Sequence, residues 1–227
     1  MSDQNTAKQK AGEYAATFIK NGMTIGIGTG STVYYFIHAL AKRIKEGLVI
    51  NAVPTSKQTE QLTTELNIPL VDLNNVEKLD ITVDGADEID PRLQLIKGGG
   101  GALLQEKIVA AASKKLTIIA DETKLVHTLG KFPLPVEVIT FAWEQTRRHI
   151  EGLGCNKIIL RKKNDEVFVT DHKHYILDCY FEEIKDASTL TQQLNHIPGV
   201  VENGLFVNMA SNAIIAYNDG TIKEMTK

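Results

Sequence analysis

Short apolar stretches alternate with amphipathic ones through the first half of the chain. An apolar strand is expected at Met23–Ile27, and the segment after it has apolar residues at the 3.6-residue spacing of a helix. These positions are Val33, Phe36, Ile37, Leu40 and Ile44. Ser31 is expected to cap this helix and Gly47 to end it. The pattern therefore predicts a strand followed by a helix with one buried face.

The same alternation continues to residue 120. Further helices are expected at Ala7–Lys20, at Lys57–Asn67 and from the glycine run to Ala112, and strands at Val49–Val53, Ile68–Leu73, Leu79–Val83 and Leu116–Ala120. This order predicts a mostly parallel sheet with helices on both faces. Ligands of such sheets bind beyond the carboxyl ends of the strands. The loops 28–32, 84–88 and 121–124 each follow a predicted strand, so we expect them to gather at one edge.

The pattern changes after the segment Lys-Phe-Pro-Leu-Pro at residues 131–135. The order that follows is strand, helix, two or three strands, helix and strand, which suits a small ferredoxin-like α+β unit. The tail, residues 206–227, is again typical of strands and is expected to return to the first domain. We therefore predict an α/β fold. Residues 1–130 and 206–227 form a Rossmann-like domain with a mostly parallel sheet, and residues 131–205 form the smaller ferredoxin-like α+β domain.

Charge, hydropathy and cysteine content limit the classes of binding partner and the cellular location to be expected. The net charge is −3 without a sustained run of one sign, which gives no electrostatic case for binding nucleic acid or an anionic membrane surface. No stretch approaches the roughly 20 apolar residues of a spanning helix, and the polar N-terminus lacks the apolar core of a signal peptide. Cys155 and Cys179 lie outside any CxxC pattern and are expected to be reduced thiols. We expect a cytoplasmic protein.

The sequence GIGTGST at residues 26–32 lies between a predicted strand and a helix. Glycines allow a close approach of the backbone to a ligand, and the N–H groups at a helix start favour an anion. A dinucleotide site would need GxGxxG and an acidic residue after the next strand, and a nucleotide triphosphate site would need a GK[ST] ending. Both are absent. The loop predicts a phosphate-binding turn, with a plain strand-to-helix turn as the alternative.

Two further segments carry unusual chemistry. Residues 84–90 hold four carboxylates, which must be solvated, bound to metal or paired with cationic groups. No His or Cys ligand lies nearby, which argues against a metal, and a solvated acidic turn is the alternative. Residues 98–101 are four successive glycines, each costing roughly 1 kcal/mol relative to alanine in a regular element. Such a run indicates that the backbone here comes close to a ligand or to another part of the protein.

Together these segments resemble one family. GIGTGSTV, DGADEID, KGGGGALLQEK, the segment 121–124 and GKFPLPVEV at 130–138 appear in the order and at the spacing of the ribose-5-phosphate isomerase A family. Each motif is weak alone, but five in register are specific. The resemblance covers essentially the whole chain. It implies an aldose–ketose isomerase of the non-oxidative pentose phosphate pathway that interconverts D-ribose 5-phosphate and D-ribulose 5-phosphate through an enediolate, without metal or organic cofactor.

The resemblance also implies site residues. Glu106 matches the general base of the family, although Leu104-Gln105 stands where relatives often have threonine and arginine, which leaves the support of this base in question. The implied catalytic residues are Glu106, Asp84, Asp87 and Lys97. The implied substrate-binding residues are Lys8, Thr29, Gly30, Ser31, Thr32, Asp84, Gly85, Ala86, Asp87, Lys97, Gly98, Gly99, Gly100 and Lys124. Lys10 competes with Lys8 for the N-terminal contact.

Other functions of related folds remain as alternatives. A sugar-phosphate-sensing domain of a transcription regulator would need a helix-turn-helix, but about one short helix precedes the first predicted strand. An amino-sugar-phosphate deaminase usually uses a histidine acid, and no histidine lies in the three predicted loops. The family resemblance implies a homodimer, with a tetramer as the alternative.

Overall fold

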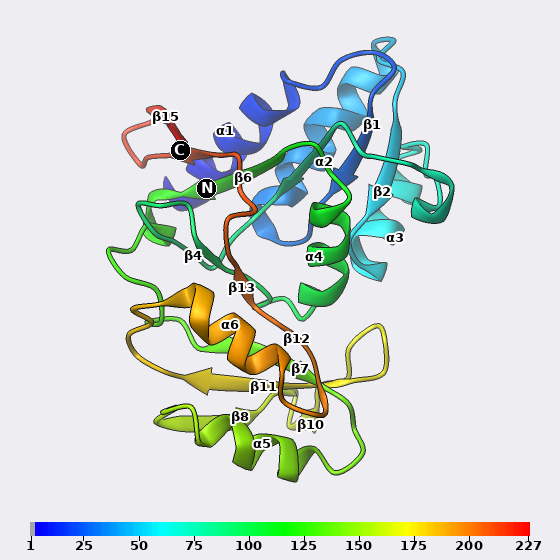
Figure 1. The fold of residues 1–227 in the computed structure, drawn as a ribbon. Coiled ribbons are helices and arrows are strands. Elements are labelled where there is room, and N and C mark those ends of the chain that lie inside the picture. Colours follow the sequence, from blue (N-terminus) through cyan, green and yellow to red (C-terminus); the bar gives the residue numbers. More distant parts are fainter. Residues whose placement is uncertain (1–2) are drawn as a thin grey trace. The chain divides into compact units, whose positions relative to one another are not determined.

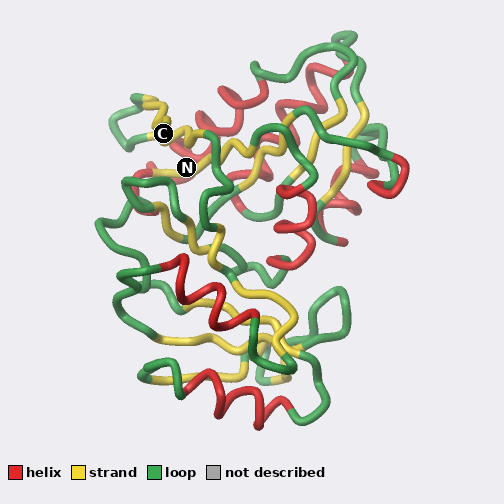
Figure 2. The backbone as a smooth tube through the Cα atoms, viewed as in Figure 1, coloured by secondary structure: helices red, strands yellow, loops and turns green. Residues whose placement is uncertain are grey.

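The computed structural model describes residues 3–227, drawn in Figures 1 and 2. Contacts divide the chain into two compact units. The first holds the chain up to Ala86, Gln105–Lys124 and Met209–Lys227, and the second holds Asp87–Leu104 and Leu125–Asn208. The prediction placed residues 87–104, 125–130 and 206–208 in the first domain, whereas their contacts group them with the smaller unit. Residues 209–227 lie in the first unit.

The first unit is built on a six-stranded sheet with the order β15-β14-β6-β3-β1-β2. Its strands are β1 (Thr24–Ile27), β2 (Asn51–Pro54), β3 (Ile81–Asp84), β6 (Leu116–Asp121), β14 (Asn212–Ala216) and β15 (Ile222–Thr226). All neighbouring pairs are parallel except β14 and β15. The mostly parallel sheet predicted from the sequence is confirmed.

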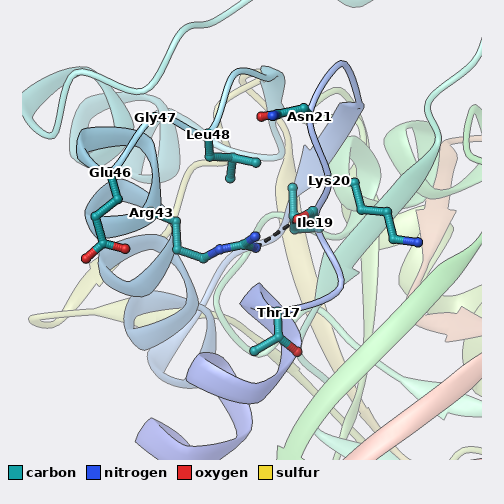
Figure 3. Close-up of a pocket in the computed structure, with 8 residues that line it drawn as sticks. All are labelled: Thr17, Ile19, Lys20, Asn21, Arg43, Glu46, Gly47 and Leu48. Atoms are coloured by element: carbon teal, nitrogen blue, oxygen red, sulfur yellow. Dashed lines mark hydrogen bonds between the residues drawn. The ribbon is translucent and has the colours of Figure 1, made fainter.

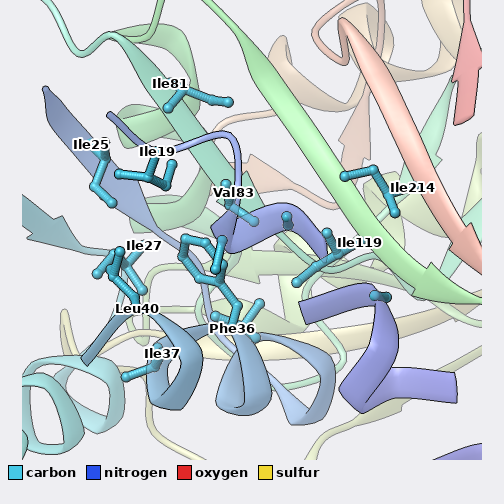
Figure 4. Packing of buried hydrophobic residues seen from close by; sticks show 14 of the residues in the cluster. Ile19, Ile25, Ile27, Phe36, Ile37, Leu40, Ile81, Val83, Ile119 and Ile214 are labelled. Carbon is cyan, nitrogen blue, oxygen red and sulfur yellow. The ribbon is translucent and has the colours of Figure 1, made fainter. Parts of the chain in front are cut away.

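Helices cover both faces of this sheet. They are α1 (Asp3–Ala16), α2 (Ser31–Lys45), α3 (Lys57–Glu65) and α4 (Leu103–Ala111). Phe36 and Leu40 of α2 lie in one fully buried cluster with Ile25 and Ile27 of β1 (Figure 4). Gly26 alternates with these isoleucines, and a Cβ there would lie 2.6 Å from Val109 of α4. Burying each such aliphatic or aromatic side chain contributes about 1.5–3 kcal/mol to the free energy of folding. Packing on both faces of the sheet therefore holds it between its helices.

The second unit contains an antiparallel sheet with the order β12-β7-β11-β8. Its elements are β7 (Leu134–Val138), α5 (Trp143–Glu151), β8 (Lys157–Leu160), β11 (Tyr175–Tyr180), α6 (Ala187–Asn195) and β12 (Val200–Asn203). Alternate residues of β7 (Leu134, Val136 and Val138) are fully buried with Ile150 of α5 and Leu194 of α6. The order β-α-β-β-α-β is that of the predicted ferredoxin-like unit.

The second unit also contains five two-residue strands. They are β4 (Glu88–Ile89), β5 (Leu95–Ile96), β9 (Lys162–Lys163), β10 (Glu166–Val167) and β13 (Leu205–Phe206). β10 overlaps the strand expected at residues 167–170, and the others were not predicted as separate strands. β5 pairs with both β4 and β13 in a three-stranded sheet, and β9 pairs with β10. Two-residue strands show no period-2 alternation, because that pattern needs about four residues to emerge. Their pairing is decided by tertiary contacts.

Two local predictions were wrong. Ser31 is the first residue of α2 rather than its cap; Gly30 holds the cap position at φ 118°, in the region that favours glycine. The predicted strand Ile68–Leu73 is reduced to a single bridge between Leu70 and Ala52, followed by the 3-10 turn η1 (Leu73–Asn75). Pro69 lies inside that segment and has no N–H for a ladder, which favours an edge with little pairing.

Within residues 3–227, no helix is both long and apolar enough to cross a membrane.

Glu88 provides a test of how the second unit is held together. This side chain is 3% exposed, and its two oxygens accept the N–H groups of Gly130 at 2.7 Å and Phe132 at 2.6 Å. Glu88→Gln turns one acceptor into a donor that faces another donor, and we expect a loss of about 2 kcal/mol in the free energy of unfolding. Urea denaturation measures it. The exposed control Glu183→Gln should change stability by less than about 0.5 kcal/mol; equal losses in both variants would contradict the role given to Glu88.

Asp80 provides a test at low pH. Hydrogen bonds from Lys114 Nζ at 2.8 Å and from the N–H of Thr24 at 3.0 Å hold the pKa of the Asp80 carboxyl below its ordinary value of 3.8. A pKa lowered by folding stabilises the fold above the unfolded pKa, and this contribution disappears as the pH falls through the folded value. Asp80→Asn should therefore unfold more easily at pH 7, by less than about 1 kcal/mol because the pair is partly exposed. In urea titrations, wild type and variant should converge as the pH falls through the lowered pKa of Asp80; a constant difference at all pH values would contradict this.

Candidate active site

The loops after β1 and β3 meet at the carboxyl edge of the first unit's sheet. The N–H of Gly28 donates to the carbonyl of Val83 at 2.9 Å, and the N–H of Thr29 donates to Asp84 Oδ1 at 3.1 Å. A Cβ on Gly28 would overlap with the Asp84 carboxylate, so glycine is needed for this close approach. β6, whose end leads to the third predicted loop, is the other neighbour of β3. The expected gathering of strand ends is present within this unit.

The hydroxyl of Thr29 is turned into the unit. Its Oγ1 lies within hydrogen-bonding distance of the hydroxyls of Thr55 and Ser56, both at 2.8 Å, and of Thr59 at 3.1 Å. These three partners are at most 4% exposed. Thr29 therefore anchors the loop through its side chain. Gly30 and Ser31, at the start of α2, are exposed to solvent. The first-turn N–H groups of a helix have no intrahelical acceptor and suit an anion.

The acidic segment 84–90 is not a solvated turn. Asp84 is fully buried and accepts the N–H of Gly85 at 2.7 Å as well as that of Thr29. In the second unit, Asp87 Oδ2 accepts the N–H of Gly99 at 2.7 Å, and Asp90 Oδ1 accepts those of Arg92 and Gln94 at 2.9 and 2.8 Å. With Glu88, all four carboxylates accept backbone N–H groups, which compensates for their burial.

Lys97 and the glycine run belong to the second unit. Lys97 is 2% exposed, its N–H donates to the carbonyl of Gly204 at 2.9 Å, and its Nζ lies 5.4 Å from the centre of the Phe206 ring. Gly98 has φ 100°, while Gly99 and Gly100 are exposed. A buried ammonium at the start of an exposed glycine loop is suited to stabilising negative charge on a ligand.

Glu106 lies in the first turn of α4 and is 4% exposed. The neighbouring Gln105 donates from Nε2 to the carbonyl of Pro54 at 3.0 Å. This bond joins α4 to the end of β2 and supports the helix that carries Glu106.

The predicted lysines differ in their contacts. Lys124 ends the 3-10 turn η2 (Glu122–Lys124), directly after β6, and is partly exposed. Lys10 Nζ donates to the carbonyl of Gly220 at 3.2 Å, which gives it a structural contact within the first unit. Lys8 lies on the same helix and is also partly exposed. This difference favours Lys8 over Lys10 as the substrate contact.

Asp121 was not singled out from the sequence as a site residue. It is 1% exposed at the end of β6, and its Oδ1 accepts the N–H of Thr123 at 3.0 Å while its Oδ2 accepts Gln4 Nε2 at 3.4 Å. The signal was present in the sequence, because Asp121 ends its strand as Asp84 ends β3. Its bonds shape the turn that carries Lys124.

A pocket of about 480 Å³ lies elsewhere on the first unit, near the last turns of α1 and α2 (Figure 3). Arg43 donates from Nη1 to the carbonyls of Ala16 and Ile19, the latter at 2.8 Å. The pocket is lined by Thr17, Ile19, Lys20, Asn21, Arg43, Glu46, Gly47 and Leu48. None of the predicted site residues is among them, and the guanidinium of Arg43 is occupied in hydrogen bonds at and just after the end of α1.

Comparisons with known proteins agree with this arrangement. The family model described as ribose 5-phosphate isomerase A (phosphoriboisomerase A) matches residues 51–220. The chain is 62% identical over 214 residues to ribose-5-phosphate isomerase A of Bacillus cereus, covering 94% of this chain and 97% of that protein.

Solved structures show the same fold. Ribose 5-phosphate isomerase from Plasmodium falciparum is 40% identical with a TM-score of 0.95, over 98% of this chain and 99% of that one. A D-ribose-5-phosphate isomerase in complex with phospho-erythronic acid is also 40% identical, with a TM-score of 0.93 over 97% of this chain and 98% of that one. By sequence and by structure, the chain belongs to the ribose-5-phosphate isomerase A family.

Proposed function

We propose that the chain interconverts D-ribose 5-phosphate and D-ribulose 5-phosphate through an enediolate, with Glu106 as the base. Family membership supports the reaction, and the solved relative that holds phospho-erythronic acid supports a phosphorylated sugar as ligand. The observation that carries the assignment of the base is the position of Glu106, a carboxylate 4% exposed in the first turn of α4.

The reaction moves one proton from C2 to C1 and a second proton from the C2 hydroxyl to the oxygen on C1. Glu106 removes the proton from C2 of the open-chain aldose, which leaves an enediolate, and returns it to C1 to form the ketose. A single carboxylate can serve both carbons because they are adjacent. Burial and the packing of α4 restrict the side chain, which favours a fixed geometry for both transfers.

The negative charge that grows on the substrate oxygens needs preorganised partners. We assign this role to the ammonium of Lys97 and the N–H groups of Gly98 and Gly100. The N–H of Gly99 donates to Asp87 Oδ2, so Gly99 is assigned to the substrate-binding loop as the residue that holds Asp87. Asp84 and Asp87 are assigned the hydroxyl protons and assistance in opening the furanose ring. Both are anchored by backbone N–H groups, Asp84 by those of Thr29 and Gly85 and Asp87 by that of Gly99. This set carries out the reaction without a metal ion or organic cofactor.

The phosphate is assigned to the start of α2 and to lysine side chains. Gly30, Ser31 and Thr32 lie where the helix dipole and first-turn N–H groups favour an anion. Lys124 and Lys8 supply positive charge in this proposal. Gly85 and Ala86, which follow β3, are assigned contacts with the sugar.

Replacing Glu106 tests the base. Glu106→Gln keeps the shape of the side chain but cannot accept a proton, so kcat should fall by a factor of about 10² or more. The measurement is turnover of ribose 5-phosphate by purified protein in the presence of a chelator. In heavy water, the wild type should also exchange the C2 hydrogen of the substrate for deuterium, and the variant should not.

The matched control is Glu60→Gln, since Glu60 is likewise an acidic residue in the first turn of a helix, α3, but is exposed. It should retain kcat within about twofold, since it contacts no proposed site group. A folded Glu106→Gln protein with wild-type turnover would remove Glu106 from the mechanism.

Lys124 tests the phosphate contact. Lys124→Met removes a charge that binds ground state and transition state alike, so KM should rise about tenfold while kcat stays within about threefold. Lys115→Met is the control, since Lys115 is exposed just before the opposite end of the same strand, β6. Steady-state kinetics at two salt concentrations would show the effect. A fall in kcat at unchanged KM would assign Lys124 to the reacting centre instead.

We also propose that the protein acts in the cytoplasm as a homodimer, as the family resemblance implies. Light scattering of the eluted protein measures the mass in solution; a mass near the 25.0 kDa of one chain would contradict the dimer.

A further inference from the structure

Arg161 is a buried cation that the mechanism above does not use. It follows β8 in the second unit, and only 12% of its side chain is exposed. Its Nε donates to Asp178 Oδ2 at 3.0 Å, and its Nη2 donates to Asp178 Oδ1. Asp178 lies on the neighbouring strand β11 and is 16% exposed. The two-point pairing fixes the plane of the guanidinium, which a lysine could not do.

The remaining arm of Arg161 holds the glycine run. Nη1 donates to the carbonyl of Gly98 at 2.7 Å and to that of Gly99 at 3.2 Å. Two successive carbonyls of the loop therefore face the same guanidinium. The loop is thus held to the antiparallel sheet of the second unit through its main-chain atoms, because glycine has no side chain that could make such a contact.

These bonds decide where the loop's N–H groups point. In a trans peptide the carbonyl of one residue and the N–H of the next lie in one plane and point in opposite directions. With the carbonyls of Gly98 and Gly99 turned toward Arg161, the N–H groups of Gly99 and Gly100 are turned away from it. The N–H of Gly99 indeed donates to Asp87 Oδ2 at 2.7 Å. Arg161 and Asp87 thus hold one peptide group from its two sides.

A second contact comes from the same part of the chain. Gly101 has φ 86°, and a Cβ on it would overlap with the ring of Phe168. The N–H of Phe168 in turn donates to the carbonyl of Arg161 at 2.9 Å. Arg161 and Phe168 together support residues 98–101, which would otherwise have the large conformational freedom of a glycine run.

We propose that Arg161 is a positioning residue for the isomerase reaction. It fixes the peptide between Gly98 and Gly99, whose N–H donates to Asp87, and the peptide between Gly99 and Gly100. The N–H of Gly100 is thereby kept oriented toward the enediolate oxygens before the substrate arrives. Asp178 in turn fixes the orientation of the Arg161 guanidinium through its two hydrogen bonds. The inference rests on the proposed function, because it requires the glycine run to contact the reacting oxygens.

The test compares Arg161→Met, Arg161→Lys and Asp178→Asn with the wild type. Arg161→Met should lower kcat about 30-fold with KM changed less than threefold, because misplaced groups cost the transition state more than substrate binding. Arg161→Lys should recover part of the loss, since an ammonium can reach a carbonyl but cannot also pair at two points with Asp178. Asp178→Asn should lower kcat less than Arg161→Met does.

The control is Arg147→Met. Arg147 lies on α5 of the same unit and pairs with Glu144 and Glu151 of its own helix, so it is an arginine in ion pairs without contact to the loop. It should leave kcat unchanged. Circular dichroism and a thermal melt confirm that each variant is folded at the assay temperature.

A second readout separates positioning from a merely structural role. Phospho-erythronic acid carries a carboxylate that resembles the enediolate, and its inhibition constant should rise across the Arg161 and Asp178 variants in proportion to the fall in kcat/KM. Folded Arg161→Met with kcat within threefold of wild type, or with reduced kcat and unchanged inhibition, overturns the inference. If Arg161→Met does not fold, full activity in folded Arg161→Lys and Asp178→Asn overturns it as well. Glu106→Gln is measured beside them: full activity there defeats the proposed function itself, whereas loss there with active Arg161 variants defeats only this inference.

Discussion

The carboxylate of Asp84 is the contact on which the ligand-facing edge of the first unit depends. It ends β3, is fully buried and accepts the N–H groups of Thr29 and Gly85. The loop after β1 is thereby fixed against the loop after β3, and the start of α2 is fixed with it. Charge-assisted bonds of this kind are among the stronger ones in proteins. Removing the acceptor would leave two N–H groups without their partner at the point where the strands end.

The rest of the acidic segment repeats this chemistry in the second unit. Asp87, Glu88 and Asp90 each accept backbone N–H groups, and Glu88 alone holds two positions of the loop 130–132. A run of like charges is thus accommodated in part by main-chain donors, because each of the four carboxylates accepts at least one backbone N–H group. The carboxylates of residues 84–90, for which the sequence left a solvated turn as the alternative, thus hold neighbouring loops in place through main-chain hydrogen bonds.

Much of the fold followed from the sequence. The 3.6-residue period of α2 and the alternation of strands and helices predicted the mostly parallel sheet, and the order of elements after Pro135 predicted the ferredoxin-like unit. The short pairs β4, β5 and β13 could not be predicted, because two residues carry no period. For the site, family motifs indicated Glu106, Asp84 and Lys97. The catalytic roles of these residues remain predictions. Arg161 had no motif, since its contact with Gly98 joins residues 63 positions apart through a carbonyl, which every residue possesses.

The grip of Arg161 and Asp87 on main-chain atoms has a consequence for how this enzyme can vary. Hydrogen bonds to carbonyl and N–H groups do not depend on which side chain the held residue carries. What restricts the held positions is space at Gly99, where a Cβ would lie 2.6 Å from Asp87 Oδ1, and backbone conformation at Gly98, which has φ 100°. Mutational tolerance in the loop is thus governed by volume and φ, while tolerance at Arg161 and Asp178 is governed by the geometry of hydrogen-bond donation. A library that randomises both regions would show separate rules of substitution, one for size and backbone conformation and one for the shape of the polar group.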